Sequence, residues 1–222
     1  AEVEDKRDKL DRVCSEDNVY FSEDDPKLPE THPVRIRHLH QHSWLCRDRI
    51  EADSPMVRLF ESDALLEFVR ALAGTRELYR HNDPIVSLSV NVQAKDDVFA
   101  WHFDSTEVSI TLLLQRPSSG GKFEFAPSLR SDDDPNYETV SAVLRGQRDK
   151  VVVLDAQPGD LVVFPGRYSL HRVTSVDCAE ERMSLVLGYA SKPNQMLAKE
   201  DVLRAFGRVH PLHDVVTGRP TQ

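Results

Sequence analysis

The chain between positions 84 and 190 is built of short runs rich in β-branched and aromatic residues, and this pattern most constrains its fold. Turns rich in Gly, Pro and Asp separate the runs. Short strands at this spacing favour two packed antiparallel sheets over a parallel sheet with crossover helices. The sequence therefore predicts a mainly β fold with flanking helices, a double-stranded β-helix or jelly roll. The eight expected strands are 85–93, 98–104, 107–115, 122–125, 151–155, 161–164, 169–174 and 183–190.

The chain is long enough for one domain and too short for two without a clear linker. Its 222 residues can bury a core of their own. We predict a single domain over residues 1–222, with a helical and irregular support at 1–83. A jelly-roll core at 84–190 and a C-terminal helix and tail at 191–222 complete it. In the first segment, an initial helix is expected to end near Cys14.

Three further segments show helical spacing. Ser62 is a suitable N-cap for a helix over 62–80, with Gly74 as a possible interruption, and this helix should back the sheet. Residues 132–148 predict a short helix between strands, which either covers a site at the mouth of the barrel or is a surface excursion. Residues 199–208 predict a C-terminal helix with its phenylalanine on the apolar side.

His102, Asp104 and His171 fit a metal site. Residues two positions apart in a strand project from the same face, so His102 and Asp104 can reach one metal while Trp101 and Phe103 pack behind them. His171 lies on another expected strand of the same barrel. Two histidines and a carboxylate cap one face of a six-coordinate Fe(II) and leave three positions open. An HxD triplet alone is common by chance, and a lone histidine on a strand is usually a packed one.

The functional interpretation of these three residues is strengthened by Arg182 and Ser184. They lie two positions apart at the start of the last expected strand, so both side chains point to one face. A guanidinium fork can grip a carboxylate bidentately, and a hydroxyl adds a further hydrogen bond. The pair therefore predicts an anchor for a dicarboxylate. Arg172 is a rival, but it neighbours His171 and would point to the opposite face of a regular strand.

Together these residues resemble the Fe(II)/2-oxoglutarate-dependent oxygenases, whose pattern is HxD, a distal His and, about ten residues later, RxS or a relative of it. The stretches 100–106 and 120–127 and the turn at 158–160 are similar to the branch that contains free-amino-acid halogenases and their hydroxylase relatives. In the halogenases a small residue stands at the carboxylate position, which frees a coordination site for chloride. Asp104 stands there in this chain, so the resemblance implies oxygenation in place of halogenation.

The resemblance also implies cofactors and a reaction. Fe(II) would be held by His102, Asp104 and His171, and the distal carboxylate of the co-substrate 2-oxoglutarate by Arg182 and Ser184, with O2 as second co-substrate. The expected dioxygenase hydroxylates an unactivated carbon of a small substrate, a free amino acid, with desaturation and cyclisation as alternatives. Two rival functions are a non-catalytic metal-binding jelly roll that senses a ligand and an oxygenase that acts on a protein side chain.

Four residues are candidate substrate contacts. Asn91, on the strand before the HxD triplet, and Trp101 have polar tips that can serve a pocket, although structural roles compete. Arg35 and Arg37 alternate and can hold a substrate carboxylate if their segment borders the mouth of the site. The histidines of 38–42 also alternate, but no cysteine or carboxylate completes a metal site there, so a solvated strand or loop is the competing interpretation.

Charge and cysteine content exclude several classes. The formal net charge of −9 argues against nucleic-acid binding, which usually needs a basic surface. No apolar stretch approaches the roughly 20 residues that span a bilayer, and the first residues are charged, so a soluble, cytoplasmic protein without a membrane partner is expected. Three cysteines without CxxC spacing predict neither a disulfide framework nor a zinc ribbon. The chain begins at Ala1, so a leading segment is expected to be missing, and no oligomeric state is indicated.

Overall fold

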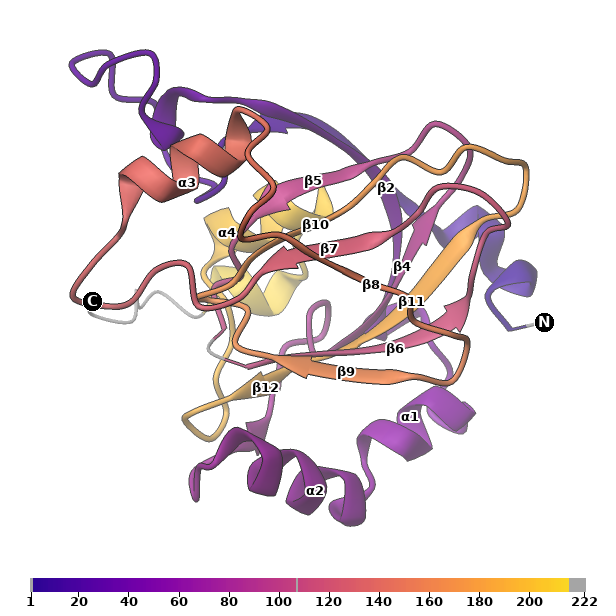
Figure 1. Cartoon of the computed structure of the whole chain (residues 1–222). Coiled ribbons are helices and arrows are strands. Elements are labelled where there is room, and N and C mark those ends of the chain that lie inside the picture. The colour runs from indigo at the N-terminus through magenta and orange to yellow at the C-terminus, as the bar shows by residue number, and fades with distance from the viewer. Residues whose placement is uncertain (1, 107, 216–222) are drawn as a thin grey trace.

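Two antiparallel sheets face each other in the structure, a computed structural model in which residues 2–106 and 108–215 are described (Figure 1). The larger sheet has the strand order β1-β2-β4-β11-β6-β9, and the smaller has β5-β10-β7-β8. A short ribbon of β3 and β12 extends the body. This is the predicted jelly roll. The strands are β1 (Asp11–Asp17), β2 (His38–Cys46), β3 (Tyr79–Arg80), β4 (Leu88–Gln93), β5 (Phe99–His102), β6 (Ser109–Gln115), β7 (Phe123–Ala126), β8 (Val152–Leu154), β9 (Leu161–Phe164), β10 (Leu170–Val173), β11 (Arg182–Leu187) and β12 (Tyr189–Ala190).

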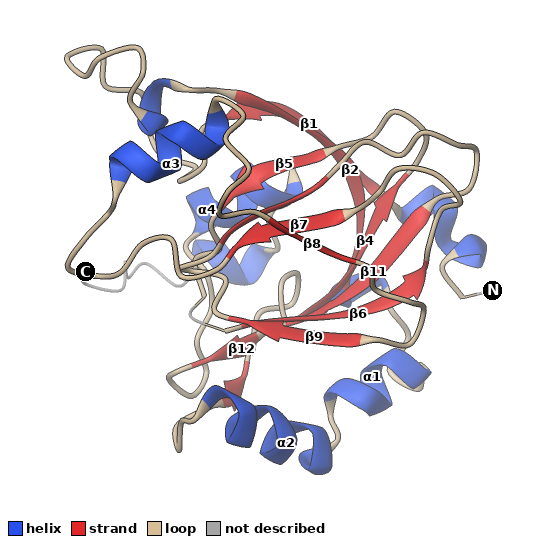
Figure 2. Ribbon diagram, in the orientation of Figure 1, coloured by secondary structure: helices blue, strands red, loops and turns tan. Residues whose placement is uncertain are grey.

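Helices lie outside the two sheets (Figure 2). None of the described helices is long and apolar enough to cross a membrane. The α-helices are α1 (Pro55–Phe60), α2 (Asp63–Ala73), α3 (Tyr137–Leu144) and α4 (Lys199–Phe206), and the 3-10 turns are η1 (Glu4–Lys9), η2 (Pro33–Arg35), η3 (Arg47–Arg49) and η4 (Pro211–Asp214).

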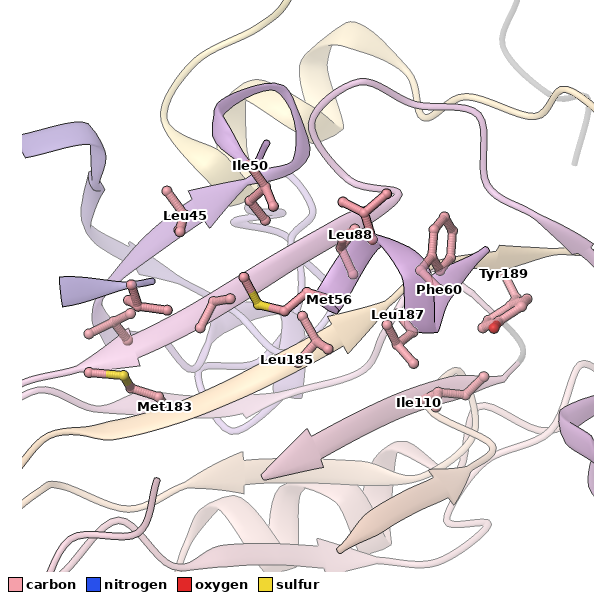
Figure 3. Close-up of a cluster of buried hydrophobic side chains, with 14 of the residues drawn as sticks. Leu45, Ile50, Met56, Phe60, Leu88, Ile110, Met183, Leu185, Leu187 and Tyr189 are labelled. Carbon is pink, nitrogen blue, oxygen red and sulfur yellow. The ribbon is translucent and has the colours of Figure 1, made fainter. Parts of the chain in front are cut away.

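The larger sheet is apolar on its outer face and largely polar on its inner face. All six residues of β4 are buried, yet Leu88, Val90 and Val92 alternate with polar residues. The apolar set joins Leu185 and Leu187 of β11 in the main core, which α1 and α2 cover (Figure 3). Because successive strand residues point to opposite faces, the polar set must face the space between the sheets.

Helix α3 covers the outer face of the smaller sheet. Its Val140 and Val143 pack against Trp101, Phe103 and Leu170 in a second core. The strands that carry Trp101 and Leu170 therefore keep their other face free for the space between the sheets.

Helix α4 closes one end of that space. Phe206 packs against Trp44, whose indole Nε1 donates to the carbonyl of Ala205 (3.1 Å). The segment after α4 is tied down by His213, whose Nε2 lies 2.9 Å from a carboxylate oxygen of Asp83. Both of these side chains are fully buried. The C-terminal segment is thus a wall of the barrel.

Each of the eight predicted runs contains a strand. Glu107, the first residue of the third run, lies outside the described residues. The last run divides at Gly188 into β11 and β12, because the backbone there approaches the Val86 carbonyl so closely that a Cβ would lie 3.0 Å from its oxygen. The sequence therefore predicted the presence of the strands more reliably than the residues at which they begin and end.

Three predicted helices are present, one of them shortened. The Ser62 hydroxyl accepts from the backbone N–H of Leu65 (3.4 Å) and caps α2 as expected. The helix stops at Gly74, the possible interruption that the sequence indicated, which adopts a left-handed conformation (φ 64°), and the helix does not continue to 80. The segments 132–148 and 199–208 contain α3 and α4.

The predicted initial helix to Cys14 is wrong. The turn η1 ends at Lys9, and β1 pairs with β2 along its whole length, Asp11 opposite Trp44 and Asp17 opposite His38. Pairing with a neighbouring strand overrides a weak local helical pattern. Because β1 and β2 belong to the larger sheet, the barrel begins well before the predicted core boundary.

Candidate metal centre and ligand cavity

His102, Asp104 and His171 converge between the two sheets. His102 on β5 lies directly opposite His171 on β10, and Asp104 follows two residues after His102. The two carboxylate oxygens of Asp104 lie 3.6 Å from His102 Nε2 and 3.4 Å from His171 Nε2. One ligand atom from each residue lies within 4.8 Å of the others. Ligand atoms that share one ion are about 3 Å apart, so small side-chain movements complete a facial site.

The hydrogen bonds of the two histidines prepare them as ligands. Nδ1 of His102 lies 2.7 Å from the Ala100 carbonyl, and Nδ1 of His171 lies 2.8 Å from the Ser169 carbonyl. Each carbonyl can only accept, so each Nδ1 donates its proton there and each Nε2 faces the centre, where a metal can bind it. Burial, with help from His171, lowers the pKa of His102 and keeps it neutral.

Asp104 stays ionised although its side chain is only 28% exposed. Burial alone would raise its pKa, but the neighbouring His171 and His102 and the donating hydroxyl of Ser109 outweigh that effect and hold the pKa well below its usual range. Two neutral imidazoles and one carboxylate are the donor set that fits Fe(II). The residues present therefore fit the ion that the sequence pattern implied.

Gly166 makes room for the carboxylate, a role that sequence reasoning missed. The Asp104 N–H donates to the Gly166 carbonyl (3.2 Å), which brings the two backbones together. A Cβ at Gly166 would overlap with both the Asp104 carboxylate and the Ser109 hydroxyl. No other residue type leaves Asp104 where it is.

Arg182 and Ser184 face the same cavity as the three ligands, about 450 Å³ in volume. Arg182 is only 7% exposed, and no acidic side chain of the described residues neutralises it. Burial lowers its pKa to about 10, so it remains a cation at neutral pH. A buried cation without a counter-charge is suited to a bound anion. The rival Arg172 points to the outer face, where it pairs with Glu124 (2.8 Å).

The structure places one of the four candidate substrate contacts in the cavity. Asn91 lines the cavity and lies opposite Ser184 in the sheet. Trp101 does not, because its neighbour His102 points inward and Trp101 therefore points outward into the core under α3. Arg35 pairs with Asp24 (3.1 Å), and neither it nor Arg37 lines the cavity. The structure therefore places Trp101, Arg35 and Arg37 away from the cavity.

Sequence reasoning missed the histidines of β2. His40 and His42 are each 1% exposed and line the cavity, so the solvated interpretation of this segment is wrong. Burial, joined by neighbouring histidines, lowers the pKa of both to about 3. The one signal in the sequence was the alternation of the histidines with other residues, which a solvent-facing strand shows as well.

The rim also carries charges that the sequence did not single out. Arg130 and Arg167 come from the loops beside α3 and β9, and Asp201 and Arg204 from α4. The guanidinium of Arg130 lies 3.9 Å from the ring centre of Phe103. Helix α3 itself contributes no residue to the cavity, so the expected surface excursion fits it better than a cover.

Comparisons with known proteins agree with this geometry. The family described as Halogenase D matches residues 25–203, a span that includes all five predicted metal and co-substrate residues. A 2OG-Fe(II) oxygenase family oxidoreductase from Burkholderia pseudomallei is 17% identical over 86% of this chain and 78% of its own (TM-score 0.53). AviO1 from Streptomyces viridochromogenes Tue57 is 16% identical over 85% and 76% (TM-score 0.53). EctD from S. alaskensis is 21% identical over 77% and 63% (TM-score 0.51). At these identities the structures share a fold with the chain, and no curated protein matches it.

Proposed function

This chain belongs to the halogenase D family, and on that premise we propose that it hydroxylates an unactivated carbon of a small substrate, a free amino acid. It is an enzyme of the Fe(II)/2-oxoglutarate-dependent oxygenase class. Desaturation and cyclisation of the substrate are the alternative outcomes of the same oxidation.

Asp104 carries the choice of hydroxylation over halogenation. Its carboxylate faces the Nε2 atoms of both histidines at 3.6 and 3.4 Å and takes the third ligand position. The halogenases that the chain resembles have a small residue there, which leaves room for chloride. Gly166 and the Ser109 hydroxyl hold the Asp104 carboxylate in place, so that room is filled here.

The charges of the site support Fe(II) and 2-oxoglutarate as its ligands. Fe(II) would be held by the two histidines and Asp104, and the distal carboxylate of 2-oxoglutarate by Arg182 and Ser184. The formal charges of a divalent ion, Asp104, a doubly negative co-substrate and Arg182 sum to zero, which limits the cost of burying them together. Bound Fe(II) and 2-oxoglutarate supply the activation of O2.

Aromatic rings restrict water around the ligands. Phe99 stacks on His102 with ring centres 4.1 Å apart, and Phe164 meets His171 edge-on at 4.9 Å. Excluding water strengthens the interactions of the buried charges and limits side reactions of the oxidant. These rings also fix the orientation of each imidazole.

The rim supports an amino acid as substrate. It presents Arg130, Arg167 and Arg204 together with Asp201, so charges of both signs border one cavity. An amino acid carries a carboxylate and an ammonium group close together, and such a rim can pair with each. A relative of similar fold, EctD, is known with 2-oxoglutarate and 5-hydroxyectoine, and it supports a small hydroxylated product.

The test is a product screen. Anaerobic protein with Fe(II), 2-oxoglutarate, chloride and the common L-amino acids is exposed to O2, and the mixture is read by mass spectrometry. We expect one amino acid to gain one oxygen atom, derived from labelled O2, with equimolar succinate.

A chlorinated product from the wild-type protein would overturn hydroxylation, and product from a folded Asp104→Ala protein would overturn the site. Bound Fe(II) without any consumption of 2-oxoglutarate would favour the non-catalytic sensor instead. Oxidation of added peptides with no oxidised amino acid would favour the protein-directed oxygenase.

A further inference from the structure

The cavity has a second set of buried polar groups, which we name the polar wall. Its members line the inner faces of β2 and β4, and each is between 1% and 3% exposed. Within the described part of the chain, the side-chain nitrogen and oxygen atoms of the wall have no hydrogen-bond partner that meets normal geometry. The imidazole of His42 lies near the carbonyl oxygen of Val98 without meeting that geometry. The polar wall consists of His40, His42, Ser89 and Asn91.

Buried polar groups are rarely left without partners, because each has given up its bonds to water. Several such groups on one wall of a cavity therefore indicate a bound molecule that supplies their missing hydrogen bonds. Arg182 does not complete them, because these atoms have no hydrogen-bond partner among the described residues.

The position of the polar wall separates it from the co-substrate anchor. Strand β4 lies between β11, which carries Arg182 and Ser184, and β2. Neighbouring strands are about 4.8 Å apart, so β2 runs about 10 Å from the anchor strand. The His40 ring is nevertheless only 6.1 Å from the ring of His102, and His42 packs on Phe99, which stacks on His102. The end of the wall formed by His40 and His42 thus adjoins the metal ligands on the side away from Arg182, where a substrate would lie, while Asn91 lies opposite Ser184.

The chemistry of the polar wall selects a neutral partner. A neutral imidazole, a hydroxyl and a carboxamide each both donate and accept hydrogen bonds. Asp97, the acid whose charge acts on His42, is already held by Arg12 and Gln41. The wall itself offers neither a carboxylate nor a cation, so a charged group bound there would lie unpaired, which is costly. A group that donates and accepts without charge matches this chemistry. His42 and Asn91 are the two members that one small group can reach together, because Asn91 pairs with Trp44, two residues from His42, whereas Ser89 pairs with Cys46, six residues or about 20 Å along the strand from His40.

We propose that the polar wall is the subsite for the substrate's side chain and takes a neutral carboxamide or ureido group, while the charged ends of the amino acid stay at the rim. This rests on the proposed function of the cavity. It narrows the substrate from any amino acid to those whose side chain ends in such a group, L-glutamine, L-asparagine and L-citrulline among them.

Tryptophan fluorescence reads binding at the wall without turnover. Only two tryptophans are present. Trp44 lines the cavity with its ring 5.3 Å from that of His42, whereas Trp101 lies on the outer face. In a Trp101→Phe background, the anaerobic protein loaded with Fe(II) and 2-oxoglutarate is titrated with five probes. The probes are L-glutamine, L-citrulline, L-lysine, L-glutamate and L-norleucine.

We expect L-glutamine or L-citrulline to bind at least tenfold more tightly than the cationic, anionic and apolar probes. His42→Leu should remove most of that preference and leave L-norleucine binding unchanged or improved. His38→Leu is the matched control, because His38 lies on the same strand but outside this cavity, and it should bind like the parent.

Preferred binding of L-lysine or L-glutamate would overturn the neutral subsite, as would no binding of any probe. Parent-like L-glutamine binding by His42→Leu, with unchanged thermal unfolding, would overturn the role of the wall. The proposed function is judged separately by product formation. Oxidation of a charged amino acid would leave it standing while the subsite fails, and tight L-glutamine binding without any oxidised product would do the reverse.

Discussion

Replacing Arg182 by methionine should make the ligand-free protein more stable and unable to bind 2-oxoglutarate. Burial lowers the pKa of Arg182 from 12.5 to about 10, so its charged form is disfavoured in the folded state. At every pH below about 10, both folded and unfolded protein carry the charge and the full penalty applies, and it disappears only above the ordinary pKa of arginine. Two and a half pKa units correspond to about 3 kcal/mol. Water in the cavity reduces this, and we expect a gain of about 2 kcal/mol in the free energy of unfolding.

The loss of ligand binding should be larger than that gain. A guanidinium fork on a carboxylate makes two charge-assisted hydrogen bonds, each about 1.5 to 3 kcal/mol, so the affinity for 2-oxoglutarate should fall at least a hundredfold. Urea unfolding with and without 2-oxoglutarate measures both effects, since a ligand that binds only the folded state adds stability according to its affinity. Wild type should gain stability with 2-oxoglutarate, and Arg182→Met should not.

Arg172→Met is the matched control. Arg172 lies on the outer face and pairs with Glu124, so its loss should cost roughly 1 kcal/mol and leave 2-oxoglutarate binding intact. If Arg182→Met were less stable than wild type without ligand and still stabilised by 2-oxoglutarate, both the unpaired charge and the anchor would be wrong.

Three further predictions concern the metal ligands. His171→Ala should fold normally and lose Fe(II)-dependent succinate formation, which an enzymatic succinate assay measures; near-normal turnover would refute the ligand set. Gly166→Ala should weaken Fe(II) binding at least tenfold in an anaerobic titration and cost about 1 to 3 kcal/mol of stability, because the new Cβ overlaps with Asp104 and Ser109; unchanged affinity would show that Gly166 does not position the carboxylate. Asp104→Gly should admit chloride yet halogenate poorly, because steering the outcome also depends on surrounding residues; efficient halogenation, seen by mass spectrometry, would show that those residues already suit it.

The convergence of the three proposed metal ligands could be predicted because it depends mainly on local geometry. Two residues apart on a strand means one face, whichever sheet the strand joins, and the later histidine needed only a second strand. The same rule predicted that Arg182 and Ser184 share one face of their strand and that Arg172 points away from the face of His171. The presence of the strands could be predicted for the same reason, because turn residues and runs of β-branched residues are also local features of the sequence.

The rest of the site depends on what lies across the barrel. His40 and His42 alternate along β2 as solvent-facing residues would, and only the opposite sheet and α4 turn that face into a cavity wall. Arg35 was placed by its spacing, but its partner Asp24 comes from an irregular loop that no periodicity describes. Strand β1 was mistaken for a helix because its pairing with β2 is the only thing that specifies it.

Because outward and inward residues alternate along β4 and β11, the two sets differ in how freely they can be substituted. Truncating an outward residue such as Leu88 or Leu185 would leave a hole in the main core and cost about 2 to 5 kcal/mol, enough to unfold many domains. The polar residues of β4 between them, Ser89 and Asn91, belong to none of the hydrophobic core clusters. A lineage or an engineer can therefore exchange Ser89 or Asn91 and explore new substrates on an unchanged scaffold, one strand position at a time.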